Sequence, residues 1–203
     1  MKIKSLLEEG NRILKKNNIL TYKLDCEILM SKAIKEDRKF IILNQNKKTN
    51  LLCSNFFKSL IQERAKGKPI AYILGKKDFW KYQFNLSENV LIPRPDTELI
   101  IQSVLNLTRY KKKLNILDIG TGSGCILMSI LKEKPSFYGV GIDISKKCID
   151  LSKTNARNLG LNNKVKFFKT DVDKFKYGKY DLIVSNPPYI KNIDLKYLEK
   201  DVI

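Results

Sequence analysis

The fold is decided by residues 116–124, whose sequence is Ile-Leu-Asp-Ile-Gly-Thr-Gly-Ser-Gly. The opening residues are mostly apolar, as in a buried strand, and a helix-like pattern begins at Cys125. Between them, Gly120, Gly122 and Gly124 permit positive φ angles and let a ligand approach the backbone closely. A strand, a glycine-rich turn and a helix in this order indicate a ligand site at the carboxyl end of the strand.

The turn departs from the fingerprint of dinucleotide-binding proteins. That fingerprint is Gly-x-Gly-x-x-Gly, and Cys125 stands where its third glycine belongs. This departure disfavours a pyrophosphate, whereas the polar turn Gly120–Gly124, with Thr121 and Ser123, suits an ammonium and a carboxylate group such as those of methionine. Asp118, just before the turn, is expected to accept hydrogen bonds from the turn amides. A purely structural turn is the alternative.

Acidic residues also follow the next two predicted strands. Asp143 comes after the strand at 138–142 and is placed to accept both ribose hydroxyls of a nucleoside, although this alone does not separate NAD from S-adenosylmethionine. Asp171 and Val172 follow the strand at 165–169. Asp171 is expected to accept a hydrogen bond from an adenine amino group, and Val172 to pack on the ring. A plain helix cap is the alternative role for Asp171.

The part of the chain after residue 114 alternates strand and helix, which predicts an α/β fold with a doubly wound parallel sheet. The strands are expected at 115–119, 138–142, 165–169 and 180–185, and the helices at 125–134 and 145–159.

The first 75 residues are predicted to form a small helical domain, whose role is either substrate docking or a folding cap. Apolar residues recur at helical spacing over 3–14 and over 24–33, and a third helix is expected to begin at Ser54 as N-cap and to stop at Gly67. The second domain, residues 76–203, is expected to open with a β-hairpin whose polar turn is Ser87–Asn89. Asp96 is expected to cap the helix that follows.

Asn186-Pro187-Pro188-Tyr189 follows the last predicted strand. Neither proline has an N–H and both fix φ, so the chain leaves the sheet there. The Asn186 side-chain carbonyl and the Pro187 backbone carbonyl can accept both hydrogens of one NH2 group, while Tyr189 packs over the planar group. Such a grip aims the nitrogen lone pair at a methyl donor by orientation and preorganised charge, without a strong base. The alternative is a tight turn.

Composition restricts the chemistry further. The chain has no histidine, which excludes a histidine base or metal ligand. Its four cysteines lie far apart, as in a reduced cytoplasmic protein without a metal site. Its 39 Lys and Arg against 21 Asp and Glu give a net charge of +18, which suits either an anionic partner such as nucleic acid or a solvated basic surface. No apolar run approaches the roughly 18 residues of a membrane span.

The motifs together resemble those of the HemK/PrmC family, the N5-glutamine methyltransferases that modify peptide chain release factors. The tetrapeptide alone is shared with adenine and cytosine N-methyltransferases, whereas Pro-Arg-Pro-Asp-Thr-Glu and the helical leader are particular to this family. The matching segments are 69–75, 90–98, 116–126, 141–145 and 181–190.

The resemblance implies methyl transfer from S-adenosylmethionine to the side-chain nitrogen of the Gln in the Gly-Gly-Gln motif of a release factor. It implies that Asn186, Pro187, Pro188 and Tyr189 hold the glutamine and carry the chemistry. The residues that it implies for donor binding are Gly120, Thr121, Gly122, Ser123, Gly124, Asp143, Asp171, Val172 and Asn186.

The resemblance also implies a methyltransferase sheet with a strand order like 3-2-1-4-5-7-6, and this chain ends shortly after the fourth strand. We therefore expect the 203 residues alone to be poorly stable and inactive. The competing functions are an N6-adenine methyltransferase of DNA or RNA, and a remnant that binds donor or release factor without turnover. A cytoplasmic monomer is expected, with direct nucleic-acid binding possible but not required.

Overall fold

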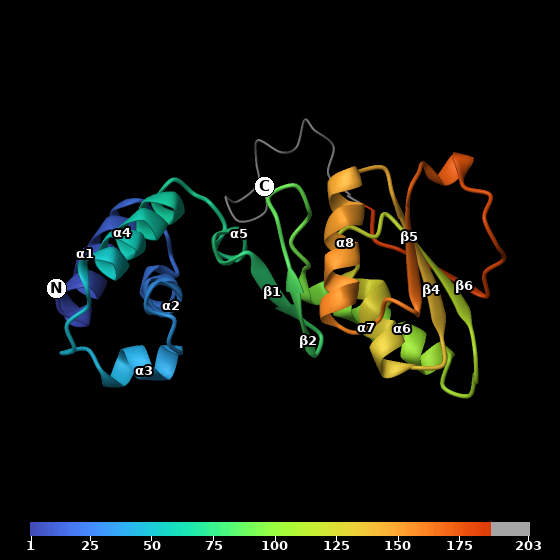
Figure 1. The fold of residues 1–203 in the computed structure, drawn as a ribbon, viewed down its shortest axis with the longest axis horizontal. Coiled ribbons are helices and arrows are strands. Elements are labelled where there is room, and N and C mark those ends of the chain that lie inside the picture. Colours follow the sequence, from blue (N-terminus) through green and yellow to red (C-terminus); the bar gives the residue numbers. More distant parts are fainter. Residues whose placement is uncertain (188–203) are drawn as a thin grey trace. The chain divides into compact units, whose positions relative to one another are not determined.

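The computed structural model describes residues 1–187. Within them the chain forms two compact units, the first spanning Met1–Leu74 and the second beginning at Gly75 (Figure 1). The first unit is helical, and the second holds a β-hairpin and a four-stranded sheet. No helix within residues 1–187 is long and apolar enough to cross a membrane.

The helical unit packs around one apolar core. Its elements are α1 (Ile3–Lys16), α2 (Tyr22–Ile34), α3 (Arg38–Leu43), α4 (Leu51–Ala65) and α5 (Ile70–Leu74). Leu6, Leu14, Leu29, Phe57 and Ile61 are among the side chains buried between these helices. The helical prediction for this part of the chain is therefore confirmed.

The predicted start of the third long helix at Ser54 was wrong. Asn50 is the N-cap of α4, and its side chain accepts a hydrogen bond from the Cys53 N–H at 2.7 Å. Asn50 has the extended backbone that a cap requires, with φ −72° and ψ 167°. Ser54 lies buried inside the helix, where its hydroxyl donates to the Asn50 carbonyl at 2.9 Å.

A buried ion pair joins α2 to α4. Arg64 Nε donates to Asp25 Oδ2 at 2.7 Å, and both side chains are almost fully buried. The Thr21 hydroxyl donates to the same oxygen at 2.9 Å, and Arg64 Nη1 donates to the Lys68 carbonyl at 3.0 Å. These hydrogen bonds offset the cost of taking two charges out of water.

The hairpin of the second unit turns at Trp80–Lys81, so the turn predicted at Ser87–Asn89 was wrong. Strand β1 (Lys76–Phe79) pairs antiparallel with β2 (Tyr82–Asn85). Trp80 adopts φ +57°, which is unfavourable for a bulky residue. Its backbone N–H donates to Glu98 at 2.7 Å and its indole N–H to Glu133 at 3.0 Å, and these two contacts stabilise the turn.

Asp96 does not cap the next helix, contrary to the prediction. Pro95 fixes a helical φ and begins the 3₁₀ helix η1 (Pro95–Thr97), so Asp96 lies inside this turn. Helix α6 (Glu98–Leu107) follows directly. The prolines therefore bring Thr97 to the junction of two helical elements.

The sheet confirms the predicted α/β class. Its strands are β3 (Asn115–Ile119), β4 (Tyr138–Asp143), β5 (Val165–Lys169) and β6 (Leu182–Ser185). They are parallel, in the order β5-β4-β3-β6. Helix α7 (Cys125–Glu133) connects β3 to β4, and α8 (Lys146–Asn158) connects β4 to β5.

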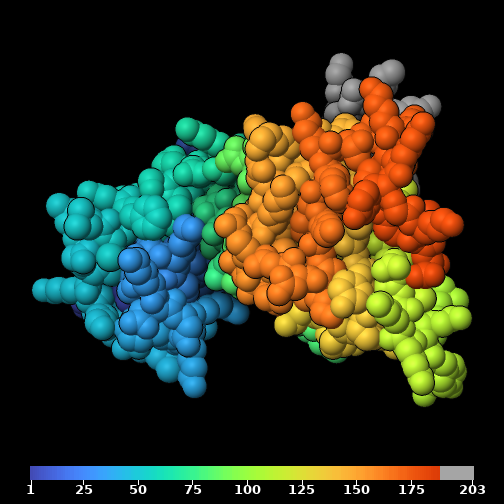
Figure 2. Space-filling model, turned by 45° about the vertical axis from the view of Figure 1, so that its right-hand side comes forward, coloured from blue at the N-terminus to red at the C-terminus, as the bar shows by residue number. Residues whose placement is uncertain are grey.

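Helices α6, α7 and α8 bury one face of this sheet (Figure 1). Leu127, Ile130 and Phe137 are wholly buried in the core between them and the strands. The opposite face carries a smaller cluster around Val140 and Ile142. The residues after β5, coloured orange to red, lie at the surface of the second unit in the space-filling view of Figure 2.

Candidate active site

The candidate site lies where the strand order reverses. The chain passes from β3 outward to β4 and β5, then returns to place β6 on the other side of β3. Ile119 at the end of β3 is paired with Ser185 at the end of β6. The glycine-rich turn and Asn186 therefore leave neighbouring strands at the same edge, which is the usual ligand position in such sheets.

The three glycines of the turn adopt the positive φ angles that the sequence predicted. The values are +70° at Gly120, +56° at Gly122 and +80° at Gly124. A Cβ at Gly124 would collide with the Met128 side chain and lie 3.3 Å from the Ser152 hydroxyl. The backbone conformation therefore favours glycine at Gly124, and a larger residue would also force the Met128 side chain to move.

Two buried polar side chains of α8 hold the carbonyl groups of this turn. The Ser152 hydroxyl donates to the Gly122 carbonyl at 2.8 Å, and Asn155 Nδ2 donates to the Ser123 carbonyl at 2.9 Å. Asn155 also exchanges hydrogen bonds with both backbone groups of Asn85 at the end of β2. One side chain thus joins the hairpin, the turn and α8.

Sequence reasoning missed Ser152 and Asn155. Their spacing does indicate burial. Ser152 and Asn155 are three residues apart, on the same side of α8 as the buried Ile149 and Ala156. Polar residues on an apolar helix face require partners, although the sequence does not say which groups they contact.

Asp118 lies buried beneath the turn. Its Oδ2 accepts a hydrogen bond from the Thr121 hydroxyl at 2.7 Å, so a side chain of the turn takes the place of the expected turn amides. Burial raises the pKa of the Asp118 carboxyl to about 7, an effect that the Thr121 hydroxyl partly offsets and the nearby Asp143 carboxylate increases. The protonation state of Asp118 therefore changes near neutral pH.

Asp143 is the last residue of β4 and faces the turn from the neighbouring strand. Its Oδ2 accepts from the Gly122 N–H at 3.0 Å, and its Oδ1 accepts from the Ser145 N–H at 2.8 Å. Two hydrogen bonds fix the plane of the carboxylate, which has about four acceptor positions in all. The predicted contact with ribose hydroxyls uses the remaining positions and stays a prediction.

Asp171 and Val172 lie beyond β5. Asp171 Oδ1 accepts from the Asp173 N–H at 3.1 Å and caps the short 3₁₀ helix η2 (Val172–Lys174). Val172 leaves 48% of its surface exposed. The structure therefore gives Asp171 the capping role that was the alternative, and the adenine contacts of both residues stay predictions.

Asn186 is half-buried, and its side chain reaches the segment before α6. Asn186 Nδ2 donates to the Thr97 hydroxyl oxygen at 3.0 Å. The preceding Ser185 hydroxyl donates to the Ile119 carbonyl at 2.9 Å, which fixes the end of β6 against β3. Pro187 is exposed, and Pro188 and Tyr189 lie outside the described residues.

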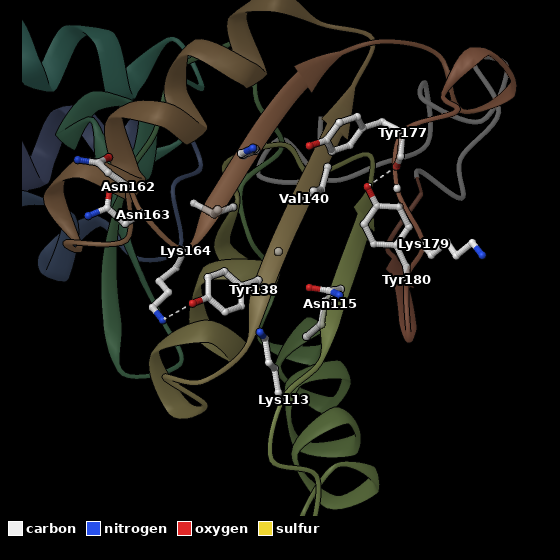
Figure 3. A pocket seen from close by; sticks show the side chains of 15 residues that line it. Lys113, Asn115, Tyr138, Val140, Asn162, Asn163, Lys164, Tyr177, Lys179 and Tyr180 are labelled. Atoms are coloured by element: carbon white, nitrogen blue, oxygen red, sulfur yellow. Dashed lines mark hydrogen bonds between the residues drawn. The ribbon is translucent and has the colours of Figure 1, made fainter.

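A cavity of about 670 Å³ lies elsewhere, at the amino ends of the strands (Figure 3). Asn115, Tyr138 and Tyr180 line it, and Tyr180 donates to the Tyr177 carbonyl at 2.7 Å. It contains none of the residues predicted for donor or substrate, because those leave the opposite ends of the strands. The candidate site is therefore defined by its polar groups and not by this cavity.

Two family models match the chain. The methyltransferase small domain matches residues 95–200, and the PrmC N-terminal domain matches residues 5–75. Together with the parallel sheet, these matches define the class of protein: the chain is an S-adenosylmethionine-dependent methyltransferase.

Curated relatives identify the family. Proteins named release factor glutamine methyltransferase are 36% identical in Buchnera aphidicola subsp. Baizongia pistaciae and 37% identical in Leptospira interrogans, over 100% and 99% of this chain. The chain belongs to the release factor glutamine methyltransferase family. It spans 73% and 72% of the length of these two relatives, and 61% of one from Bradyrhizobium diazoefficiens.

Solved structures are more distant. A ribosomal protein L11 methylase from Lactobacillus delbrueckii is 25% identical, with a TM-score of 0.44, and the match covers 55% of this chain and 57% of that one. A methyltransferase from Geobacter sulfurreducens, solved with S-adenosyl-L-homocysteine, is 24% identical, with a TM-score of 0.39, over 45% of this chain and 36% of the other.

Proposed function

We propose that the protein transfers a methyl group from S-adenosylmethionine to the side-chain amide nitrogen of the Gln in the Gly-Gly-Gln motif of peptide chain release factors. The observation that carries the proposal is the placement of Asn186 beside the glycine-rich turn, at the adjoining end of the neighbouring strand. Among residues 1–187, no hydrogen-bond donor contacts Asn186 Oδ1. We assign this oxygen to accept from a substrate amide, and the release factor glutamine methyltransferase relatives support the choice of glutamine.

The residues around the turn fit the donor. A Cβ at Gly120 would meet no atom within 4 Å, so the space beside the turn is open to a ligand. Asp143 is oriented by two backbone amides and keeps acceptor positions for two ribose hydroxyls. Val172 presents an exposed apolar surface to a ring.

The chemistry requires positioning more than acid–base catalysis. S-adenosylmethionine, when bound, supplies an electrophilic methyl group on a sulfonium centre. Asn186 Oδ1 and the Pro187 carbonyl accept one hydrogen each from the glutamine NH2 group, which orients the nitrogen lone pair. None of the 203 residues is a histidine, so no histidine of this chain accepts the proton that the nitrogen loses.

The alternative acceptor is the N6 atom of adenine in DNA or RNA. The net charge of +18 favours a polyanionic substrate, and an adenine amino group offers the same two hydrogens to Asn186 and Pro187. The two functions differ in the molecule that is labelled, so one assay separates them.

The assay incubates the protein with methyl-labelled S-adenosylmethionine and either a release factor or nucleic acid. It is run with the 203-residue chain and with the same chain joined to the carboxyl-terminal part of the Leptospira relative, since the chain spans 72% of that protein. Label on the release factor from either form supports the proposal. Label on nucleic acid alone, or on neither substrate with both forms, contradicts it.

A further inference from the structure

Thr97 is the only residue within 1–187 that hydrogen-bonds to the side chain of Asn186. The Thr97 side chain is 8% exposed, and its Oγ1 accepts from Asn186 Nδ2 at 3.0 Å. The two residues are far apart in sequence and come from different elements, η1 before α6 and the end of β6. The contact therefore depends on the fold of the whole second unit.

Thr97 itself is rigidly placed. It closes the 3₁₀ helix that Pro95 begins, and its backbone N–H donates to the Arg94 carbonyl at 3.1 Å. Its hydroxyl is thus held in position by a segment whose φ angle is fixed by proline. The Thr97 hydroxyl therefore stays in place and cannot keep its hydrogen bond if the Asn186 side chain moves away.

Asn186 is restrained from both ends by different groups. Its backbone is fixed by the Ser185 hydroxyl, which donates to the Ile119 carbonyl, and by Pro187, which restricts the residue before it to extended conformations. These contacts leave the side-chain torsions free. The Thr97 hydroxyl is the group that fixes the plane of the amide.

The direction of this hydrogen bond matters for the chemistry. Because the amide nitrogen donates to Thr97, the amide oxygen remains the group available to the substrate. Donation by the nitrogen also polarises the amide and makes the oxygen a better acceptor, as in other chains of hydrogen bonds. Without Thr97, the amide can rotate and present its NH2 group, which cannot accept a substrate hydrogen.

We propose that Thr97 is a positioning residue that holds the Asn186 carboxamide with its oxygen turned toward the substrate nitrogen. The inference rests on the proposed function, because it assigns Asn186 to the substrate. It gives a role at the active site to the Pro-Arg-Pro-Asp-Thr-Glu segment, residues 93–98.

The test compares Thr97→Val, which keeps the shape and removes the hydroxyl, with Thr97→Ser, which keeps the hydroxyl. Thr108→Val is the matched control, because Thr108 is also buried, at 4% exposed, but follows the other end of α6. Its hydroxyl donates to the Val104 carbonyl of the same helix at 2.7 Å. The first readout is the water exchange of the Asn186 side-chain NH2 protons by ¹⁵N NMR on the 203-residue chain. Their signals are assigned by their loss in Asn186→Asp.

The second readout is kcat at saturating donor and acceptor, with the dissociation constant for the donor measured separately. Thr97→Val should speed the NH2 exchange about fivefold, the factor expected for one neutral hydrogen bond. It should lower kcat at least about tenfold, the scale of a small misplacement of a reacting group, with a smaller change in donor affinity. Thr97→Ser should keep the NH2 exchange rate and kcat near their wild-type values. Thr108→Val should change neither the exchange rate nor kcat.

The outcomes separate the two proposals. Unchanged exchange in Thr97→Val, or unchanged kcat in a protein that transfers methyl, overturns the role of Thr97. If no wild-type form methylates a release factor, the proposed function fails, while the exchange rates still show whether Thr97 holds the Asn186 amide.

Discussion

Replacing Asn155 by alanine should damage both the stability of the second unit and its affinity for the donor. Asn155 is 1% exposed and forms three hydrogen bonds, two with the backbone of Asn85 at 2.8 and 3.1 Å and one with the Ser123 carbonyl at 2.9 Å. Asn155→Ala removes this partner from all three backbone groups, of which the Ser123 carbonyl is buried and the two of Asn85 are partly buried. The damage thus reaches the hairpin and the glycine-rich turn together.

The magnitude follows from the number of bonds. A neutral hydrogen bond contributes about 1 kcal/mol net, so the three together are worth about 3 kcal/mol of the free energy of unfolding. The turn also loses the group that holds the Ser123 carbonyl, and we expect donor binding to weaken about tenfold, or about 1.4 kcal/mol. Asn158→Ala, an exposed change near the end of the same helix, should stay within about 0.5 kcal/mol of wild type.

The assay can report on the second unit alone. Trp80 is the single tryptophan of the chain and lies in the hairpin turn, so its fluorescence in urea follows the unfolding of this unit. Titration calorimetry with S-adenosylmethionine gives the donor affinity. An Asn155→Ala protein within 1 kcal/mol of the wild-type stability and with unchanged donor affinity would refute the reasoning.

Three further predictions concern charged groups. Asp143→Ala should weaken donor binding at least about tenfold, because charge-assisted hydrogen bonds are worth about 1.5–3 kcal/mol each; calorimetry measures this, and an unchanged dissociation constant would remove Asp143 from the donor site. The folded-state pKa of Asp118, about 7, lies above its ordinary value of 3.8, so the native state binds an extra proton between these pH values. The free energy of unfolding, followed by Trp80 fluorescence, should therefore fall as pH rises from 4 to 7, by at most about 4 kcal/mol. If this free energy depended on pH in Asp118→Asn as it does in the wild type, Asp118 would not be the cause. Asp25→Ala leaves Arg64 buried without its carboxylate and should cost the helical unit about 3–5 kcal/mol in urea unfolding followed by circular dichroism; a loss below 1 kcal/mol would argue against the pair.

The sequence predicted the parts of the fold that local chemistry determines. The positive φ angles of the turn followed from Gly120, Gly122 and Gly124, since glycine adopts them at little cost. The parallel sheet followed from alternating apolar strands and amphipathic helices. In each case the signal for a single element, a glycine, a strand or a helix, lies within a short stretch of the chain, although the strands that pair are far apart in sequence.

The misplaced hairpin turn is an error that distant residues explain, whereas the misplaced helix caps at Ser54 and Asp96 depend on neighbouring residues, Asn50 and Pro95. Trp80 adopts a left-handed conformation because Glu98 and Glu133, 18 and 53 residues away, accept its two N–H groups. No local pattern marks that turn, whereas Ser87–Asn89 is polar and resembles one. The roles of Thr97 and Asn155 were missed for a related reason, because a buried polar side chain is understood only once its partner is known.

Mass spectrometry gives the most direct test: a release factor is incubated with S-adenosylmethionine and with the chain joined to the carboxyl-terminal part of the Leptospira relative, and is then analysed for added methyl groups. We expect one added methyl group on the Gln of the Gly-Gly-Gln motif, with none on a factor in which this Gln is replaced by a residue without an amide. Asn186→Ala should greatly reduce the modification, while Thr108→Val should preserve it. Methylation at another residue, or normal methylation of the Gln by Asn186→Ala at saturating donor, would contradict the central claim.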